Sequence, residues 1–252
     1  MWRTLQGLGR HLVDAILPRY CASCGVGLGS TSNSAFCEAC WSSIRLIAPP
    51  YCPCCGRPFR SPLALAYSPE HRCGACRRKP PAFDSARAIG RYEGPLREAI
   101  HLLKYRGKLS LRRPLLQLAL AHFQAHFGGA TFDALIPVPL HRRRLMRREF
   151  NQSAVLATGL ARQLGSVVWE QVLQRSRWTR PQVELSGDER RRNMRDAFRV
   201  TDAARLEGKA LLLVDDVLTT GATVGEAARV LKAAGAARVD VFALARVVQR
   251  VD

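Results

Sequence analysis

The sequence predicts an α/β protein with a parallel sheet covered by helices on both faces, preceded by a small cysteine-rich domain. Two observations support this prediction. Apolar strand-like runs alternate with helical patterns over residues 83–252, and such strand–helix–strand repeats form right-handed parallel sheets. All nine cysteines lie between Cys21 and Cys76, a segment too short to hold a core by itself. We therefore expect two domains, residues 1–82 and residues 83–252.

The composition of the 252-residue chain indicates a globular protein with anionic partners. Hydrophobic residues make up 47% and charged residues 23%, which excludes a wholly disordered chain. No run reaches the roughly 18 apolar residues of a membrane-spanning helix, so stable membrane insertion is not expected. The net charge of +19 favours nucleic acid, phosphorylated metabolites or an acidic membrane surface. Arginines are 34 of the 39 basic residues, which suits phosphate recognition but also follows from codon bias.

The first 20 residues predict a short amphipathic helix. Leu5, Leu8, Leu12 and Ile16 recur at three- and four-residue intervals before Pro18. We expect this helix to pack on the cysteine-rich domain, and binding to a membrane surface is the alternative. Charged residues interrupt any signal-peptide core. The expected location is therefore cytoplasmic, with a peripheral position at the inner face of the membrane as the alternative.

Eight of the nine cysteines form four C-x-x-C pairs, which predicts two structural zinc sites. Twelve residues separate the first two pairs and 17 separate the last two, and paired knuckles of this kind supply the four thiolates of tetrahedral zinc. A disulfide framework or a redox C-x-x-C is the alternative, but four pairs without a secretory signal favour metal. Cys54 is spare, an alternative ligand to one of its neighbours. The predicted ligands are Cys21, Cys24, Cys37 and Cys40 at the first site, and Cys52, Cys55, Cys73 and Cys76 at the second.

After residue 82, short apolar runs predict strands, and apolar residues at three- and four-residue spacing predict helices. In the second of these helices, Leu116, Leu120, Phe123 and Phe127 are expected on one face. Residues 139–148 are expected to form a loop. In chain order we expect a strand at 89–92, helices at 95–104 and 111–127, a strand at 134–138, a helix at 151–164, strands at 167–169 and 209–214, a helix at 224–234 and a strand at 238–247.

One strand end carries the chemistry of a sugar-phosphate site. The apolar run Leu211–Val214 delivers Asp215 and Asp216 to the edge of the sheet where ligands of parallel sheets bind. Adjacent carboxylates suit a vicinal diol or Mg²⁺. Hydroxyls, a permissive glycine and a helix start follow, and they form an anion cradle for a phosphate. A phosphate and a diol together describe ribose 5-phosphate. An acidic strand end before an N-capped helix is the alternative, and neither a Walker loop nor G-x-G-x-x-G is present.

The run Val214–Thr223 resembles the motif that binds 5-phosphoribosyl 1-pyrophosphate (PRPP) in type I phosphoribosyltransferases. Over nearly its full length the chain resembles the competence protein ComF family. Besides the cysteine-rich start, the resemblance rests on Tyr92–Arg97, Leu103–Tyr105, Pro137–His141, Phe150–Ser153, and Glu189-Arg190 with Asn193. It implies a type I phosphoribosyltransferase-like fold, a double zinc ribbon, PRPP chemistry and a role in DNA uptake during natural transformation.

The resemblance also implies a role for each part of the site. Asp215 and Asp216 are the expected catalytic pair, acting with PRPP and Mg²⁺, and Arg175–Asn193 is the expected lid, with Gln182 among its contacts. The loop after residue 138 would hold the pyrophosphate, where donors and cations are needed. A solvated basic segment is the alternative for residues 142–148, and an ordinary helix-end lysine is the alternative for Lys104. The implied PRPP-binding residues are Lys104, Val138, Pro139, Leu140, His141, Arg142, Arg190, Asp215, Asp216, Thr219, Thr220, Gly221, Ala222 and Thr223.

Two functions of different classes follow from these features. The first is an enzyme that displaces pyrophosphate from Mg-PRPP with a nucleophile that the sequence does not identify. The second is a non-catalytic protein that keeps the PRPP pocket as a sensor or relic and uses its zinc ribbons and arginine surface to bind single-stranded DNA or a competence-associated helicase. Stacking platforms for DNA would come from Trp41, Tyr51, Phe59 and Trp178. The oligomeric state is open, and a homo-oligomer is among the options. Glu149 departs from the family, which usually has a glycine there, and strain is expected if that position has a positive φ.

Overall fold

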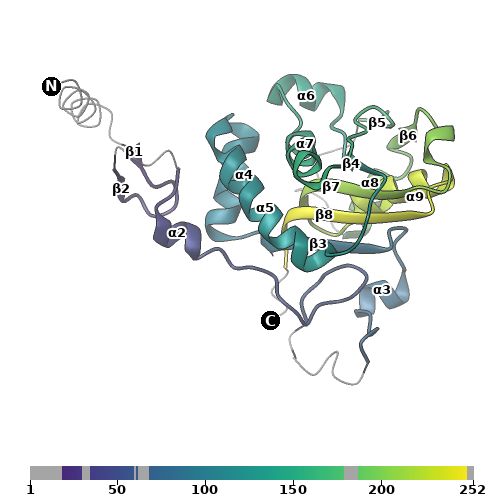
Figure 1. The fold of residues 1–252 in the computed structure, drawn as a ribbon, viewed down its shortest axis with the longest axis horizontal. Coiled ribbons are helices and arrows are strands. Elements are labelled where there is room, and N and C mark those ends of the chain that lie inside the picture. Colours follow the sequence, from purple (N-terminus) through teal and green to yellow (C-terminus); the bar gives the residue numbers. More distant parts are fainter. Residues whose placement is uncertain (1–18, 30–34, 60, 62–67, 179–186, 249–252) are drawn as a thin grey trace.

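The computed structural model describes residues 19–29, 35–59, 61, 68–178 and 187–248 (Figure 1). The amphipathic helix predicted between Leu5 and Ile16 lies outside these residues. Within the described ranges, no helix combines the length and the apolar character that crossing a membrane requires.

Four parallel strands form the central sheet, in the spatial order β3-β8-β7-β4 (Figure 1). The two long strands, β7 and β8, lie in the middle and pair with each other from Ala210 to Leu218. Strands buried on both faces are almost continuously apolar, which is why these runs were recognisable in the sequence. The predicted parallel sheet is confirmed. The strands are β3 Ser85–Arg91, β4 Ala134–Pro137, β7 Ala210–Leu218 and β8 Arg238–Arg246.

Helices cover both faces of this sheet. Successive residues of a strand point to opposite faces, so Leu212 and Val214 of β7 pack with the helices of one face, while Leu211 and Leu213 pack with α9 on the other. The first face carries α4 Gly94–Tyr105, α5 Arg112–Phe127 and α7 Gln152–Leu164, and the second carries α9 Ala222–Ala233. Short 3₁₀ turns at Leu109–Leu111 and Ala204–Leu206 precede α5 and β7.

Two predictions of strand structure need correction. Residues 167–169 form a single bridge, between Leu135 and Val168, because only Leu135 of β4 exchanges backbone hydrogen bonds with them. A separate antiparallel pair follows, which the polar sequence did not predict. It consists of β5 Leu173–Arg175 and β6 Phe198–Val200, and α8 Gly187–Met194 lies between its strands.

The buried face of α5 differs by one position from the prediction at its start. Leu115 and Ala119 are buried there, together with the predicted Phe123 and Phe127. Leu116 is only half-buried, because it packs over Gly159 of the neighbouring helix, where a Cβ would lie 2.6 Å from the leucine side chain. Contact between the two helices therefore sets the rotation of α5 about its axis.

The cysteine-rich part has few regular elements, as expected of a zinc ribbon. Two short strands pair in antiparallel fashion near the first cysteines, and one short helix follows in each ribbon. These elements are β1 Arg19–Tyr20, β2 Gly27–Leu28, α2 Glu38–Ser42 and α3 Gly74–Arg78.

The segment that joins the two ribbons covers the outer edge of β3. The N–H of Ile47 donates to the carbonyl of Ile89 at 2.8 Å, and the N–H of Ala86 donates to the carbonyl of Cys54 at 2.7 Å. Gly56 lies so close that a Cβ on it would collide with the carbonyl oxygen of Ala86. Exposed edge strands invite unwanted pairing, so the second ribbon both binds and protects the sheet.

This close approach predicts different costs for two otherwise equivalent glycines. Gly25 and Gly56 each follow the first cysteine pair of their quartet, with φ of 73° and 68°. A Cβ added to Gly25 would meet no atom within 4 Å, whereas one added to Gly56 would meet the backbone of Ala86. We expect Gly25→Ala to lower the free energy of unfolding by about 1 kcal/mol, through its conformation alone. We expect Gly56→Ala to lower it by about 3 kcal/mol, because the collision is added. Chemical denaturation of the zinc-loaded variants measures both, and equal losses would contradict the packing described.

Candidate functional site

The eight predicted zinc ligands converge as two quartets. In each quartet the sulfurs lie within 4.8 Å of one another. The Sγ atoms of Cys24 and Cys37 are 3.7 Å apart, as are those of Cys55 and Cys73. Zn–S bonds of about 2.3 Å place the sulfurs of a tetrahedron ~3.8 Å apart. All nine cysteines are free thiols, so the disulfide alternative is wrong and the donor sets fit structural zinc.

Equivalent hydrogen bonds join the two cysteine pairs within each quartet. The N–H of Cys37 donates to Cys21 Sγ at 3.3 Å in the first, and the N–H of Cys73 donates to Cys52 Sγ at 3.4 Å in the second. Such N–H···S contacts help to orient thiolate ligands. Cys54 is buried but lies outside the quartets. The alternative in which Cys54 replaces a neighbouring ligand is therefore not what the structure shows.

Asp215 and Asp216 lie at the carboxyl end of β7, and two helices contribute the groups that hold them. Lys104 Nζ, near the end of α4, is 2.7 Å from Asp216 Oδ1, and both side chains are 13% exposed. Ser153, near the start of α7, donates from Oγ to Asp215 Oδ1 at 3.2 Å. The N–H of Asp216 donates to the same oxygen at 2.9 Å. This ion pair distinguishes Lys104 from an ordinary helix-end lysine.

Burial beside a second carboxylate makes Asp215 hard to ionise. Burial and then the charge of Asp216 raise the pKa of Asp215 to about 7, against the opposing effect of Lys104. Burial also disfavours the charged form of Lys104, but attraction to Asp216 outweighs it and raises the pKa of the lysine. Near neutral pH the site therefore holds one titrating carboxyl group beside a fixed ion pair.

The loop after β7 turns directly into the N-terminus of α9. Gly221 precedes the helix with φ of 80°, a conformation that costs other residues about 1–2 kcal/mol. The N–H of Ala222 donates to Thr220 Oγ1 at 3.3 Å. The predicted phosphate loop, Thr219–Thr223, is partly exposed at every residue. Its N–H groups and hydroxyls are therefore placed where an anion can reach them.

The second predicted loop lies at the same edge of the sheet because it is tied to β7 and to α7. The N–H of Val138 donates to the carbonyl of Val214 at 2.9 Å. Asn151 Nδ2 donates to the carbonyl of Val138 at 3.1 Å, and Asn151 Oδ1 accepts the N–H of Ser153 at 3.1 Å. Sequence reasoning did not assign Asn151 or Ser153 to the site, although both belong to the Phe150–Ser153 motif that carried part of the resemblance.

The basic segment after this loop is a helix, α6 Arg142–Arg148, and the predicted loop at 139–148 is wrong in that part. Arginine is a good helix former, and His141 caps the helix by accepting the N–H of Arg143 on Nδ1 at 3.3 Å. Glu149 ends it in the left-handed region with φ of 64°. Glu149 therefore adopts a backbone conformation that favours glycine, which costs any other residue about 1–2 kcal/mol.

An exposed row of arginine–aromatic contacts lies on α6. The guanidinium carbons of Arg143 and Arg144 are 5.7 and 5.3 Å from the ring centroid of Trp178. The guanidinium of Arg148 is 4.9 Å from the ring of Tyr105, which directly follows the lysine of the ion pair. Trp178 is 38% exposed and Tyr105 is 59% exposed. The row therefore combines cations and accessible rings next to the carboxylates.

The predicted lid is described only in part. Gln182 and the side chain of Arg190 lie outside the described residues. The carbonyl of Asn193 in α8 accepts a hydrogen bond from Arg177 Nη2 at 2.8 Å. This bond ties α8 to the chain that follows β5.

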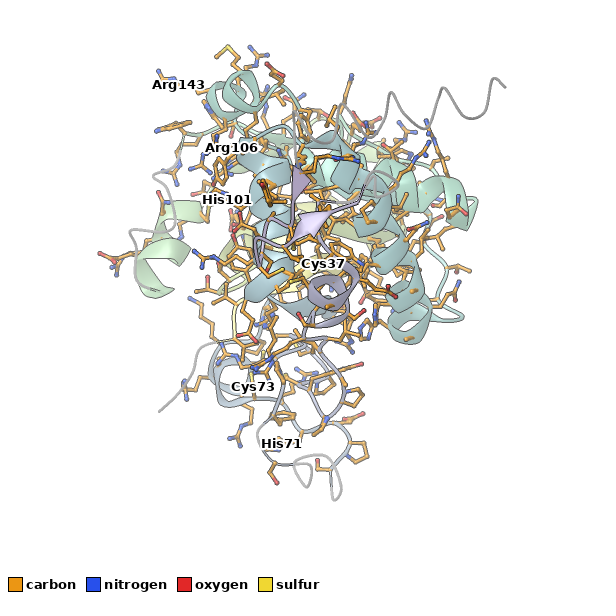
Figure 2. The ribbon with its side chains drawn as sticks, turned by 90° about the vertical axis from the view of Figure 1, so that its left-hand side faces the viewer. Cys37, His71, Cys73, His101, Arg106 and Arg143 are labelled. Atoms are coloured by element: carbon orange, nitrogen blue, oxygen red, sulfur yellow. The ribbon has the colours of Figure 1, made fainter. Side chains whose placement is uncertain are left out.

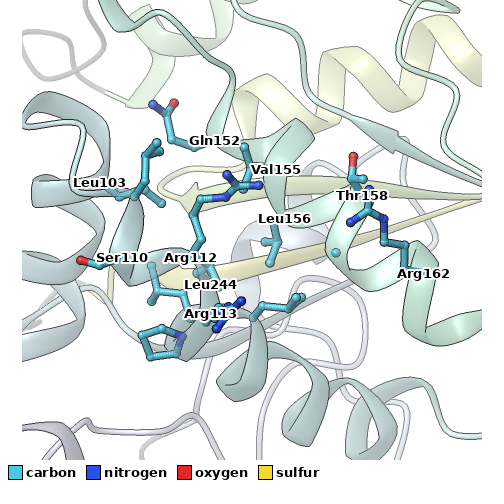
Figure 3. Close-up of a pocket in the computed structure, with 15 residues that line it drawn as sticks. Leu103, Ser110, Arg112, Arg113, Gln152, Val155, Leu156, Thr158, Arg162 and Leu244 are labelled. Atoms are coloured by element: carbon cyan, nitrogen blue, oxygen red, sulfur yellow. The ribbon is translucent and has the colours of Figure 1, made fainter. Parts of the chain in front are cut away.

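A hollow of about 830 Å³ lies between α5 and α7 (Figure 3). Leu103 and Gln152 line it, and each is the sequence neighbour of a residue that holds the carboxylates. Gln152 is buried, and its Nε2 atom has no hydrogen-bond partner among the described residues. The basic residues in the lining are Arg112, Arg113 and Arg162. Asp215 and Asp216 do not line this hollow.

Comparison with known proteins gives two family matches and full-length relatives. A double zinc ribbon domain matches residues 12–77, and a phosphoribosyl transferase domain matches residues 151–251. DNA utilization protein YhgH of Salmonella typhimurium is 35% identical over 91% of this chain and 98% of its own length. Competence protein F of Haemophilus influenzae is 32% identical over 90% and 96%. Competence protein ComFC of Bacillus subtilis is 27% identical over 83% of each chain. Together with the parallel sheet, these matches confirm the predicted fold class.

The raised pKa of Asp215 predicts a pH-dependent stability. This carboxyl holds its proton up to about pH 7 in the folded state, against an ordinary pKa of 3.8, so its contribution to the free energy of unfolding falls as pH rises between these values. We expect Asp215→Asn to remove that fall and to be more stable than the wild type by about 1–3 kcal/mol at pH 8. The measurement is denaturant unfolding of the ligand-free protein between pH 4 and pH 8.

Asp133→Asn is the matched control for this measurement. The N–H of Ala210 and the ammonium of Lys209 lower the pKa of Asp133, so that carboxylate stabilises the fold above its ordinary pKa and the effect is lost in acid. The two variants should therefore differ from the wild type with opposite signs at pH 8. A profile for Asp215→Asn that runs parallel to the wild type would contradict the assignment.

Proposed function

The chain belongs to the competence protein ComF family, and from this premise we propose that it binds PRPP at the carboxyl end of β7. The observation that carries the proposal is the meeting of three features at one edge of the sheet: a pair of adjacent carboxylates, the exposed N-terminus of a helix and a loop that leads into a basic helix. PRPP offers a diol, a 5-phosphate and a pyrophosphate, one group for each feature.

Each part of the ligand is proposed to meet groups of suitable chemistry. The loop Thr219–Thr223 and the N-terminus of α9 would bind the 5-phosphate through N–H groups and hydroxyls. Asp215 and Asp216 would accept hydrogen bonds from the ribose hydroxyls. The loop 138–141 and Arg142 would bind the pyrophosphate.

The donor set also fits the magnesium that accompanies PRPP. Asp215 and Asp216 supply carboxylate oxygens, the ligands that Mg²⁺ prefers. Proteins usually bind Mg²⁺ through one or two carboxylates together with phosphate oxygens of the substrate. The bound ion would offset the negative charge of the pyrophosphate. Because the pKa of Asp215 is about 7, binding of a cation there should release a proton, and affinity should rise as pH passes through 7.

Displacement of pyrophosphate is the reaction class that this arrangement supports. As the bond between the anomeric carbon and the pyrophosphate breaks, positive charge develops on the ribose and negative charge on the leaving group. The carboxylates would stabilise the ribose, and the arginines of α6 would stabilise the leaving group. Burial and the nearby arginines lower the pKa of His141, so it serves as a neutral hydrogen-bonding group at pH 7.

The proposal predicts that Asp216→Asn weakens binding of Mg-PRPP by about tenfold or more, the effect of losing one charge-assisted contact. Titration calorimetry measures the affinity, and metal analysis should show an unchanged zinc content. Asp133→Asn, at the opposite end of the sheet, is the control and should bind like the wild type. Equal affinities of Asp216→Asn and the wild type would refute this site, and pyrophosphate release with candidate acceptors then tests catalysis.

A second candidate function, binding of single-stranded DNA, is favoured by the arginine–aromatic row. Residues 139–200 contain 14 basic and 6 acidic residues, and Trp178 and Tyr105 offer exposed rings for bases to stack on. The other predicted platforms, Trp41, Tyr51 and Phe59, are only partly exposed and lie outside this row. The relatives are named for competence and DNA utilization, which agrees with this proposal. Contact with a helicase stays a prediction.

For this function we expect Trp178→Ala to lower the affinity for an oligothymidine by about tenfold, the effect of one lost stacking contact. Trp178→Phe keeps a ring and should retain most of the affinity. Fluorescence anisotropy at several salt concentrations measures both, and affinity should fall steeply with salt if phosphates are bound. Identical affinities of the alanine variant and the wild type, or a flat salt response, would exclude this row as the DNA site.

A further inference from the structure

The two zinc quartets differ in their surroundings. In the second quartet all four cysteines are buried, whereas in the first only Cys21 is buried and Cys24 is exposed. Cys37 of the first quartet and Cys73 of the second lie in separate parts of the molecule (Figure 2). Zinc with four thiolates carries a net charge of about −2. Water can solvate that charge at the first quartet, but the second needs compensation from the protein.

A buried arginine provides that compensation. Arg246, the last residue of β8, is 3% exposed. Its Nη1 donates to the carbonyl of the ligand residue Cys55 at 2.8 Å. The guanidinium therefore lies next to one ligand residue of a quartet whose four cysteines are all buried. Among the ion pairs between described residues, none joins Arg246 to a carboxylate. A guanidinium costs several kcal/mol to bury without an opposite charge, so the thiolates and the arginine require each other.

The same arginine adjoins the phosphate loop. Arg246 pairs in register with Leu218, the last residue of β7, and the N–H of Val247 donates to the carbonyl of Leu218 at 2.8 Å. Leu218 directly precedes Thr219. Phe83, which belongs to the same apolar cluster as the second quartet, lies against Gly221 of that loop.

From these contacts we propose that Arg246 is the buried counter-charge of the second zinc quartet, and that zinc at this quartet holds the phosphate loop in place. Arg246 is a positioning residue, since it acts through the zinc ligands and through β7. The first quartet packs on the other face of the sheet, where α2 contacts α4 and Cys21 belongs to the apolar cluster that includes residues of α4, α5 and α7. The part of the inference that concerns the phosphate loop rests on the proposed PRPP function.

The test measures zinc release from the full-length protein under a chelating metal indicator. The wild type should hold two zinc ions per chain and release them in two phases, one for each quartet. Arg246→Met should accelerate one phase at least tenfold, a typical effect of removing an outer-shell partner of a metal ligand. Arg246→Lys keeps the charge and should restore most of the slow release. Arg238→Met, at the other end of β8, is the matched control and should leave both phases unchanged.

Two cysteine variants keep the test decisive if Arg246→Met does not fold. Cys24→Ser and Cys55→Ser should each lose one zinc, but only Cys55→Ser should also lower the thermal stability of the transferase domain and weaken Mg-PRPP binding tenfold or more. Release from Arg246→Met at the wild-type rate, or equal effects of the two cysteine variants, would overturn the inference. Failure of the wild type to bind PRPP would overturn the proposed function and leave the zinc-release result standing.

Discussion

Two carboxylates placed side by side at the end of a buried strand are the constraint on which the site depends. Asp215 and Asp216 repel each other and lose hydration, which is why the pKa of Asp215 rises to about 7. They are tolerated because α4 brings Lys104, α7 brings Ser153 and the backbone of Asp216 adds an N–H. Three elements that are distant in sequence must therefore meet at one edge of the sheet. A ligand that supplies hydroxyls or a cation would offset the same cost.

The cysteine-rich part is joined to this sheet rather than attached by a free linker. Backbone hydrogen bonds from Ala86 and Ile47 close the outer edge of β3, and the guanidinium of Arg246 reaches the carbonyl of Cys55. An edge strand needs such cover to avoid pairing with other chains. The second ribbon thus belongs physically to the transferase-like core, while the more exposed first quartet lies further along the chain toward the N-terminus.

The net charge of +19 is unevenly distributed along the chain. Residues 201–252, which include Asp215 and Asp216, have equal numbers of acidic and basic residues, whereas residues 139–200 have 14 basic and 6 acidic residues. Helix α6 presents part of this excess beside the loop 138–141, with Trp178 and Tyr105 among the arginines. A field of this form attracts polyanions toward this edge of the sheet.

Features that depend on local pattern could be predicted from the sequence. Cysteine spacing predicted the quartets, apolar runs predicted the central strands, and the run from Val214 to Thr223 predicted the turn from β7 into α9, because each is encoded in neighbouring residues. The fold was needed to show that Lys104 pairs with Asp216, that Asn151 and Ser153 hold the two loops, and that Arg246 contacts Cys55 of the second quartet. The fold also makes residues 142–148 helical, with His141 as the cap, and limits residues 167–169 to one bridge, because only Leu135 of β4 hydrogen-bonds to them. These contacts join residues as many as 191 positions apart. Local sequence periodicity therefore cannot predict which charged residue contacts which partner.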